Sequence, residues 1–230
     1  MLCPPEVIHR LYGSSMTAEW TLPPFLSEPP VGARDRLRQY FVDQLPDGSG
    51  PRYTGAMFDR LGCEARIAES PNAFTPLDIV AVSMLSVDVP AMASIRMLGA
   101  DADLLTDLLT QIPPDLDLVD ATTAHIGKGS PALALWRHVR SYRGVGRTKA
   151  SKLLARKRPR LLPIQDSVVE AALHHEGDFW IALHAQLNAD DRRMSQWLRN
   201  ARTAAGVDNN VGELRIFDVL VWTWGKDLGF

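Results

Sequence analysis

Cysteine is nearly absent from the sequence, which has only Cys3 and Cys63 among its 230 residues. Two thiols exclude a disulfide framework, a four-cysteine zinc site and an iron–sulfur cluster held by four thiolates. No apolar run approaches the roughly 18 residues that a membrane span needs. The N-terminus also lacks the basic start and apolar stretch of a secretory signal. We therefore expect a cytoplasmic protein in a reducing setting, with no membrane partner.

The alternation of apolar and polar residues that marks β-strands is also missing. Apolar residues instead recur at helical spacing, most clearly in the last segment, at Leu214, Phe217, Val221, Trp224 and Leu228. The pattern predicts helices over 33–45, 77–87, 102–112, 131–142, 148–157, 166–175, 178–188, 191–204 and 212–228, with weaker ones at 91–98 and 118–126. We expect a proline-rich irregular tail at 1–30, with Met1 or Met16 as its start, and a single compact all-α domain over 31–230.

One helix start is explicit in the sequence. Thr75 suits the N-cap, Pro76 the first helical position, and Asp78 the positive end of the helix dipole. The segment 77–87 that follows is apolar nearly all round, so we expect it to be a central helix.

Positive charge is concentrated in one segment, although the formal net charge is only −2. Residues 1–120 carry a net charge of −9 and residues 166–230 one of −4, whereas residues 121–165 hold eleven basic residues and no acidic one. Such segregation causes self-repulsion unless counter-charges lie nearby. We expect this basic segment either to dock against the acidic first half of the chain or to bind a polyanion.

Two glycines in the basic segment, Gly144 and Gly146, separate two helical patterns. Glycine adopts backbone angles that side chains forbid, so the helices can meet in a tight turn whose bare amides approach an anion directly. Lys149, Lys152 and Arg156 recur at i, i+3 and i+7 and share one face of the second helix. Long cations beside a backbone anion site favour a phosphate chain over a single small anion.

This pattern, a Gly-hydrophobic-Gly turn followed by Ala150 and Leu153, resembles the helix-hairpin-helix motif, here at about 131–157. Further on, Asp166 follows a hydrophobic run and opens the next helix, which is similar to the helix-hairpin-helix superfamily of base-excision DNA glycosylases. The resemblance covers about 25 residues and implies a compact helical core that grips DNA phosphates through backbone amides, often with a monovalent cation at the turn and no other cofactor. It implies a catalytic carboxylate at Asp166 and DNA contacts at Arg143, Gly144, Gly146, Arg147, Thr148, Lys149, Lys152 and Arg156.

The sequence departs from the family pattern at several points, and one of them bears directly on the chemistry. Thr148 lies eighteen residues before Asp166, where bifunctional members carry their nucleophilic lysine, and a threonine cannot form a Schiff base. A bifunctional lyase is therefore disfavoured. The chain as a whole also resembles an uncharacterised bacterial family with no assigned activity.

Three functions remain open at this point. The leading one is a DNA-binding protein that grips the duplex backbone and has lost catalysis. The second is a monofunctional DNA glycosylase that uses Asp166. The third is a protein-binding module, such as an antitoxin whose basic segment docks on an acidic partner toxin.

Three further sets of residues have structural interpretations. Asp166 also suits a plain N-cap of the helix 166–175. Glu170 and His174 share its helix face but match no metal-ligand spacing, so no metal site is expected. Trp222 and Trp224 lie among apolar neighbours and are expected to pack in the core.

Overall fold

A computed structural model of the protein describes residues 20, 22–26, 31–61 and 70–230, and every regular element in this part of the chain is a helix. The predicted all-α fold is confirmed. None of these helices combines the length and apolar character needed to cross a membrane. Cys3, Cys63, Met16 and most of the expected tail at 1–30 lie outside the described residues.

The helices follow the predicted ranges closely, including the weak pattern at 91–98. In chain order they are η1 (Pro24–Leu26), α2 (Val31–Phe41), η2 (Thr54–Met57), α3 (Pro76–Ser83), α4 (Ala91–Leu98), α5 (Ala102–Thr110), η3 (Leu118–Asp120), α6 (Thr123–Ile126), α7 (Pro131–Arg140), α8 (Arg147–Lys157), α9 (Ser167–Leu173), α10 (Phe179–Ala205) and α11 (Glu213–Asp227). Residues 189–192 inside α10 have non-helical backbone angles. This kink confirms the break predicted between 178–188 and 191–204.

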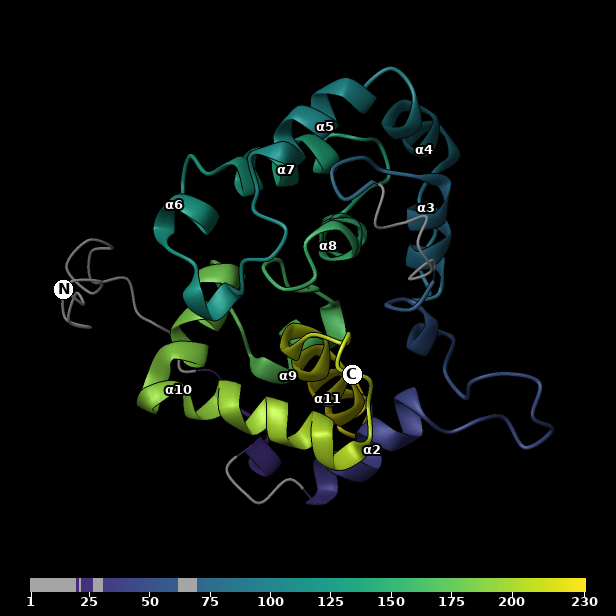
Figure 1. Cartoon of the computed structure of the whole chain (residues 1–230), viewed down its shortest axis with the longest axis vertical. Helices are drawn as coiled ribbons and strands as arrows, with labels where there is room; N and C mark the ends of the chain where they lie inside the picture. The colour runs from purple at the N-terminus through teal and green to yellow at the C-terminus, as the bar shows by residue number, and fades with distance from the viewer. Residues whose placement is uncertain (1–19, 21, 27–30, 62–69) are drawn as a thin grey trace.

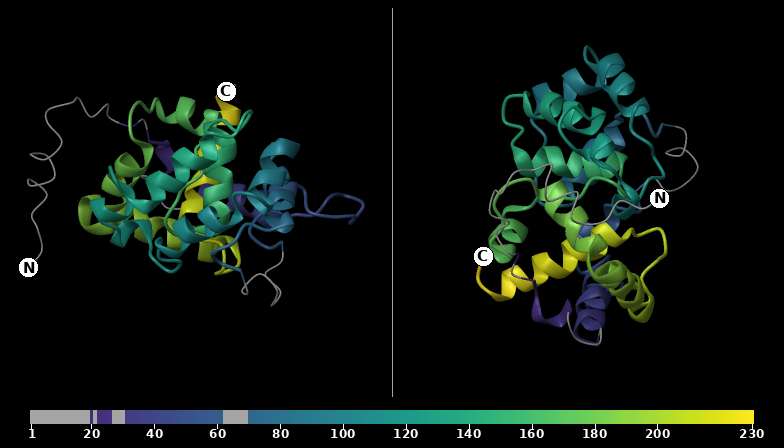
Figure 2. Two further views of the ribbon diagram at one scale, coloured as in Figure 1. Left: turned by 90° about the horizontal axis from the view of Figure 1, so that it is seen from above. Right: turned by 90° about the vertical axis from the view of Figure 1, so that its left-hand side faces the viewer.

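The helices form two groups, with α8 between them (Figure 1). One group contains α3 to α7, in which α5 packs on α7 and α3 and α7 pack on α8. The other contains α2 together with α9, α10 and α11, so the first long helix lies among the last ones. The right-hand view in Figure 2 shows the same division. Because α8 touches the first group and leads into α9, its surroundings include residues from both ends of the chain.

The central helix of the fold is α8, and the expectation that 77–87 is central was wrong. Residues 150–155 and 157 of α8 are buried. On α3, by contrast, Leu77 is 41% exposed and Val80 is 48% exposed. Figure 1 places α3 at the edge of the molecule, where only one of its faces lies against α8. An apolar run shows that a helix can be buried on any side, but it does not show how many neighbours the helix has.

Candidate functional site

The turn between α7 and α8 has the geometry that its glycines predicted. Gly144 has a φ of +79°, a left-handed conformation that favours glycine, and a Cβ there would lie 3.0 Å from Pro90 Cγ. Gly146 is the N-cap of α8, and no side chain caps this helix. The first amides of α8 are therefore not occupied by a carboxylate of the described chain. The Gly144 carbonyl accepts a hydrogen bond of 3.0 Å from the Lys149 ammonium.

The two inner cations of α8 are not on an exposed face, as their spacing had suggested. The Lys152 side chain is 6% exposed and its Nζ lies 3.0 Å from Asp166 Oδ2. The Arg156 side chain is 7% exposed and bonds to Asp78 and to the Phe58 carbonyl. The predicted cationic stripe of Lys149, Lys152 and Arg156 is therefore largely directed inward, because the segments after α3 and η2 and the start of α9 supply partners on this side of α8.

The end of the basic segment is also neutralised from inside. Lys157 Nζ lies 3.1 Å from Asp78 Oδ2, and both side chains are almost completely buried. Arg158 is fully buried and donates to main-chain carbonyls, including those of Ile112 and Pro71. Arg160 pairs with Asp117 on the surface. This part of the segment docks against the acidic first half of the chain, the first of the two outcomes expected for it.

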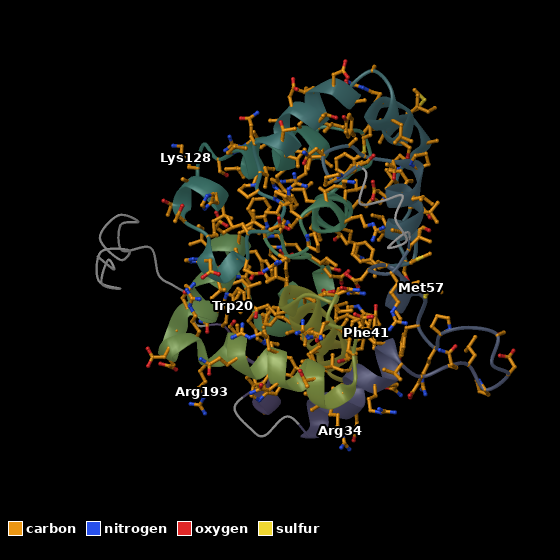
Figure 3. All side chains as sticks on the ribbon, viewed as in Figure 1. Trp20, Arg34, Phe41, Met57, Lys128 and Arg193 are labelled. Atoms are coloured by element: carbon orange, nitrogen blue, oxygen red, sulfur yellow. The ribbon has the colours of Figure 1, made fainter. Side chains whose placement is uncertain are left out.

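Apart from Arg160, the exposed cations of the basic segment lie before and at the turn. Arg147 pairs with Glu170 at 2.6 Å but remains 55% exposed. Within the basic segment 121–165, four exposed residues form no ion pair: Lys128, Arg137, Arg140 and Arg143. Lys128 projects from the outer side of the α6 region in Figure 3. The part of the basic segment that is available to a partner thus lies on the outer side of α7 and at the turn.

A cleft of about 650 Å³ opens beside the turn. Its walls come from both groups of helices: the start of α8, the start of α9, the segment after α3, and the inner sides of α2 and α11. This volume is within the range of ligand pockets, about 300–1,000 Å³. The residues that line the cleft include Tyr40, Tyr53, Ser86, Gly146, Arg147, Thr148, Lys149, Lys152, Asp166, Arg215, Asp218 and Trp222.

Asp166 caps a helix, as its sequence position suggested, and its carboxylate also lines the cleft. Its Oδ1 accepts the Val168 amide at 3.0 Å, which caps α9. Its Oδ2 accepts from Lys152, whose ammonium also donates to the Leu85 carbonyl at 2.9 Å. The carboxylate is 14% exposed and lines the cleft. Thr148 lines the same cleft and brings no amine to it.

A second carboxylate, Asp218, lines the cleft from α11. It accepts from Arg215, which also donates to Asp59, to the Tyr40 hydroxyl and to the Gly55 carbonyl. All of these side chains are strongly buried, and burial raises the pKa of Asp218 to about 6. The nearby Asp166 charge acts in the same direction, whereas Arg215 and Lys152 oppose it.

Aromatic side chains form part of the cleft wall. The Tyr40 and Tyr53 rings stack with centroids 5.0 Å apart, and Trp222 meets both edge-on. Trp222 and Tyr53 are half-buried, so the expectation that Trp222 is a core residue was only partly correct. Ser86, on the opposite segment, has a φ of +60°, a conformation that is uncommon outside glycine and clusters at functional sites.

Sequence reasoning missed this part of the site. A signal for Asp218 and Arg215 is present, because a charged pair three residues apart interrupts the otherwise apolar run 214–221. Charged residues at such positions are rarely buried without a partner. No comparable signal identifies Tyr53, which lies in a segment without clear periodicity.

The positions that could have suggested a metal site are otherwise engaged. Glu170 pairs with Arg147, and His174 is the left-handed C-cap of α9. Among the described residues no three His, Cys, Asp or Glu side chains gather to hold a metal ion.

Comparison with known proteins gives one match. A family model described as "Family of unknown function (DUF6308)" matches residues 33–225 of the chain. No curated protein and no solved structure matches it.

Proposed function

We propose, for a chain that belongs to the DUF6308 family of unknown function, that it binds duplex DNA at the hairpin and hydrolyses the N-glycosidic bond of one nucleotide turned into the cleft. In this proposal Asp166 is the catalytic carboxylate of a monofunctional DNA glycosylase. The enzyme alternative thus takes precedence over a DNA-binding protein without catalysis.

The observation that carries the proposal is the position of Asp166 beside the open N-terminus of α8. Both line one cleft, so an anion held by the amides at Gly146 and Arg147 would face the same space as the carboxylate. Enzymes that act on a base must take it out of the duplex stack into a pocket. A phosphate at the turn would place the adjoining nucleotide at the cleft.

In this proposal Asp166 stabilises the positive charge that develops on the sugar. When the bond from the sugar to the base breaks, the sugar develops an oxocarbenium-like cation, and a nearby carboxylate lowers the energy of that state. The same carboxylate can orient the attacking water. Lys152 and the Val168 amide hold Asp166 in place. Thr148 offers no amine, and the two lysines that line the cleft bond to the Gly144 carbonyl and to Asp166, so the proposal is base removal without strand cleavage.

The walls of the cleft suit an extruded base. Trp222 and Tyr53 present aromatic surface to it. Stacking on aromatic side chains contributes about 1–3 kcal/mol per base and tolerates any base, because every base has a π-face. In this proposal the aromatic wall therefore contacts the base, and the carboxylate faces the sugar of the same nucleoside.

The other hypotheses have less support in the described residues. A toxin that docks on the basic segment would reach only its exposed cations before and at the turn, because the inner α8 cations are paired inside the molecule, and it would leave the cleft beside Asp166 without a role. The monovalent cation that the resemblance implies at the turn would have to compete with Lys149 for the Gly144 carbonyl.

The proposal is tested with duplexes that each contain one altered base: hypoxanthine, uracil, 8-oxoguanine or an alkylated purine. Base release is read as strand breakage after hot alkali. We expect release from at least one duplex by the parental protein and a loss of about 100-fold or more in Asp166→Asn. Asp88→Asn, which changes an exposed aspartate, serves as the matched control.

Two results would count against this function. Release by Asp166→Asn at the parental rate would remove that carboxylate from the chemistry. A parental protein that binds these duplexes but releases no base would leave the non-catalytic DNA-binding alternative in its place.

A further inference from the structure

The cleft holds two carboxylates in unlike surroundings. Asp166 sits at a helix start and has Lys152 as its own counter-ion. Asp218 is 6% exposed and depends on Arg215, whose single guanidinium also serves Asp59. Two acids whose surroundings differ in this way can take different roles, one as an anion and one as a proton donor.

The charged and titratable groups around Asp218 come from several elements. Arg215 lies on its own helix, the Tyr40 hydroxyl on α2 and Asp59 after η2, and both contact Arg215. Lys152 and Asp166 act on it from α8 and from the start of α9. Burial shifts the pKa of Asp218 upward, toward the protonated form, and the Asp166 charge adds to this shift, whereas Arg215 and Lys152 oppose it.

From the position of Asp218 in the cleft, and on the basis of the glycosylase activity proposed above, we infer that Asp218 is the general acid that protonates the departing base. The bond between the sugar C1′ and the base nitrogen breaks, and its electron pair goes to the base. Asp218 transfers its proton to a ring nitrogen or carbonyl oxygen of that base. Water then adds to C1′ and releases a proton, so the net reaction is hydrolysis to a free base and an abasic sugar.

The test uses two leaving bases that differ in their need for a proton. Hypoxanthine leaves as an anion unless it is protonated, whereas N7-methylguanine already carries a positive charge and leaves as a neutral molecule. One duplex contains a single deoxyinosine and the other a single N7-methyldeoxyguanosine. Release is measured for the parental protein, Asp218→Asn and Asp166→Asn, after subtraction of the rate without protein.

General acid catalysis predicts a selective loss. Asp218→Asn should lose about 100-fold or more on deoxyinosine and less than about threefold on N7-methyldeoxyguanosine. Asp166→Asn should lose activity on both substrates, because the sugar cation develops in both. If Asp218→Asn lost activity equally on both substrates, Asp218 would have a structural role. If the variant kept its activity on both substrates, Asp218 would have no role in base release. Either result would overturn the inference.

A second measurement needs no variant that could fail to fold. In the parental protein, the ratio of the deoxyinosine rate to the N7-methyldeoxyguanosine rate should fall by about tenfold per pH unit above pH 6, because the acid form of Asp218 is lost. A ratio independent of pH between 5 and 7.5 would overturn the inference while leaving the glycosylase proposal intact. Failure of the parental protein to release any base from either duplex would overturn both.

Discussion

Asp78, in the first turn of α3, holds Lys157 at 3.1 Å across 79 positions of sequence. The same carboxylate bonds Arg156 at 3.2 Å and accepts the Thr75 amide at 2.8 Å in the capping box of α3. One buried aspartate thus joins the start of α3 to the end of α8. It provides much of the counter-charge that the basic segment needs.

Removal of the Asp78 charge should destabilise the protein strongly. Asp78→Asn leaves two buried cations without their carboxylate, and breaking a buried pair in this way costs about 3–5 kcal/mol. We expect a loss of that size in the free energy of unfolding measured in urea. Asp88→Asn, on the exposed segment after α3, should change the same quantity by less than about 0.5 kcal/mol. If both variants unfolded at the same urea concentration, the Asp78 network would be energetically unimportant.

The burial of these cations also changes how a charge reversal must be interpreted. Glutamate at Lys152 or Arg156 would place a carboxylate against Asp166 or Asp78. Loss of DNA binding in such a variant would report unfolding and not the loss of a phosphate contact.

The contrast between helices and charges shows what sequence can predict in this protein. Helix ranges such as 102–112 and 131–142 came out within a few residues, because periodicity, Thr75 and the prolines act locally. The partner of Lys157 could not be found in this way, since it depends on which segments meet in space. A run of eleven basic residues without acidic neighbours in sequence is typical of a binding surface. About half of these residues, however, form ion pairs with carboxylates of the same chain.

The two glycines of the turn should respond differently to alanine. Gly144→Ala places a Cβ 3.0 Å from Pro90 in a left-handed conformation, so we expect a loss of about 1–2 kcal/mol in unfolding free energy. Gly146 has a φ of −83° and open space around its Cβ position, so Gly146→Ala should fold normally.

Gly146→Ala is therefore the informative variant for DNA binding. Its methyl group lies beside the uncapped amides of α8, where it hinders close approach of a phosphate. We expect weaker binding to a 20-base-pair duplex by fluorescence anisotropy, with thermal stability unchanged. Parental affinity in Gly146→Ala would show that the amides of the turn do not hold the backbone.

The exposed arginines before the turn should carry the salt dependence of binding. Arg137, Arg140 and Arg143 are exposed without ion pairs among the described residues, and Arg140 lies over the Trp136 ring. Each phosphate that a cation neutralises contributes about 0.9 to the slope of log affinity against log salt. Reversal of all three to glutamate should lower that slope by about 2–3.

Arg193 provides the control for these reversals. It is exposed on α10, at the lower edge of the molecule in Figure 3 and away from α7. Arg193→Glu should leave the slope within about 0.5 of the parental value. An equal effect of Arg193→Glu would indicate attraction by net charge alone and no defined interface.

The aromatic wall should affect base release more than duplex binding. Trp222→Leu removes the ring that faces the cleft, so release should fall about tenfold or more if the base stacks there. Trp224→Leu changes a half-buried tryptophan of the same helix that does not line the cleft. Its release rate should stay close to the parental rate, and equal losses in both variants would point to general damage of α11.

The site itself was only partly predictable. Asp166 was found because its spacing from the glycine turn is a local feature. Asp218, Arg215 and Trp222 lie on a helix that sequence assigns to the core, and they reach the cleft because α11 packs on α9 and α2. No periodicity distinguishes a buried face that meets a cleft from one that meets another helix.

The raised pKa of Asp218 should also appear in the pH dependence of stability. Burial raises this pKa to about 6, so between about pH 4 and 6 the folded chain keeps a proton that the unfolded chain has released. Because the folded state binds more protons in that range, the contribution of Asp218 to unfolding free energy is complete below about pH 4 and is lost as the pH rises past about 6. Asp218→Asn has no such proton, so the melting temperature of the parental protein relative to this variant should fall between pH 4 and pH 7. Asp59 and Glu213, whose pKa values burial also raises, are present in both proteins, so the comparison isolates Asp218. A difference in melting temperature that stays constant over this range would show that Asp218 titrates as it does in the unfolded chain.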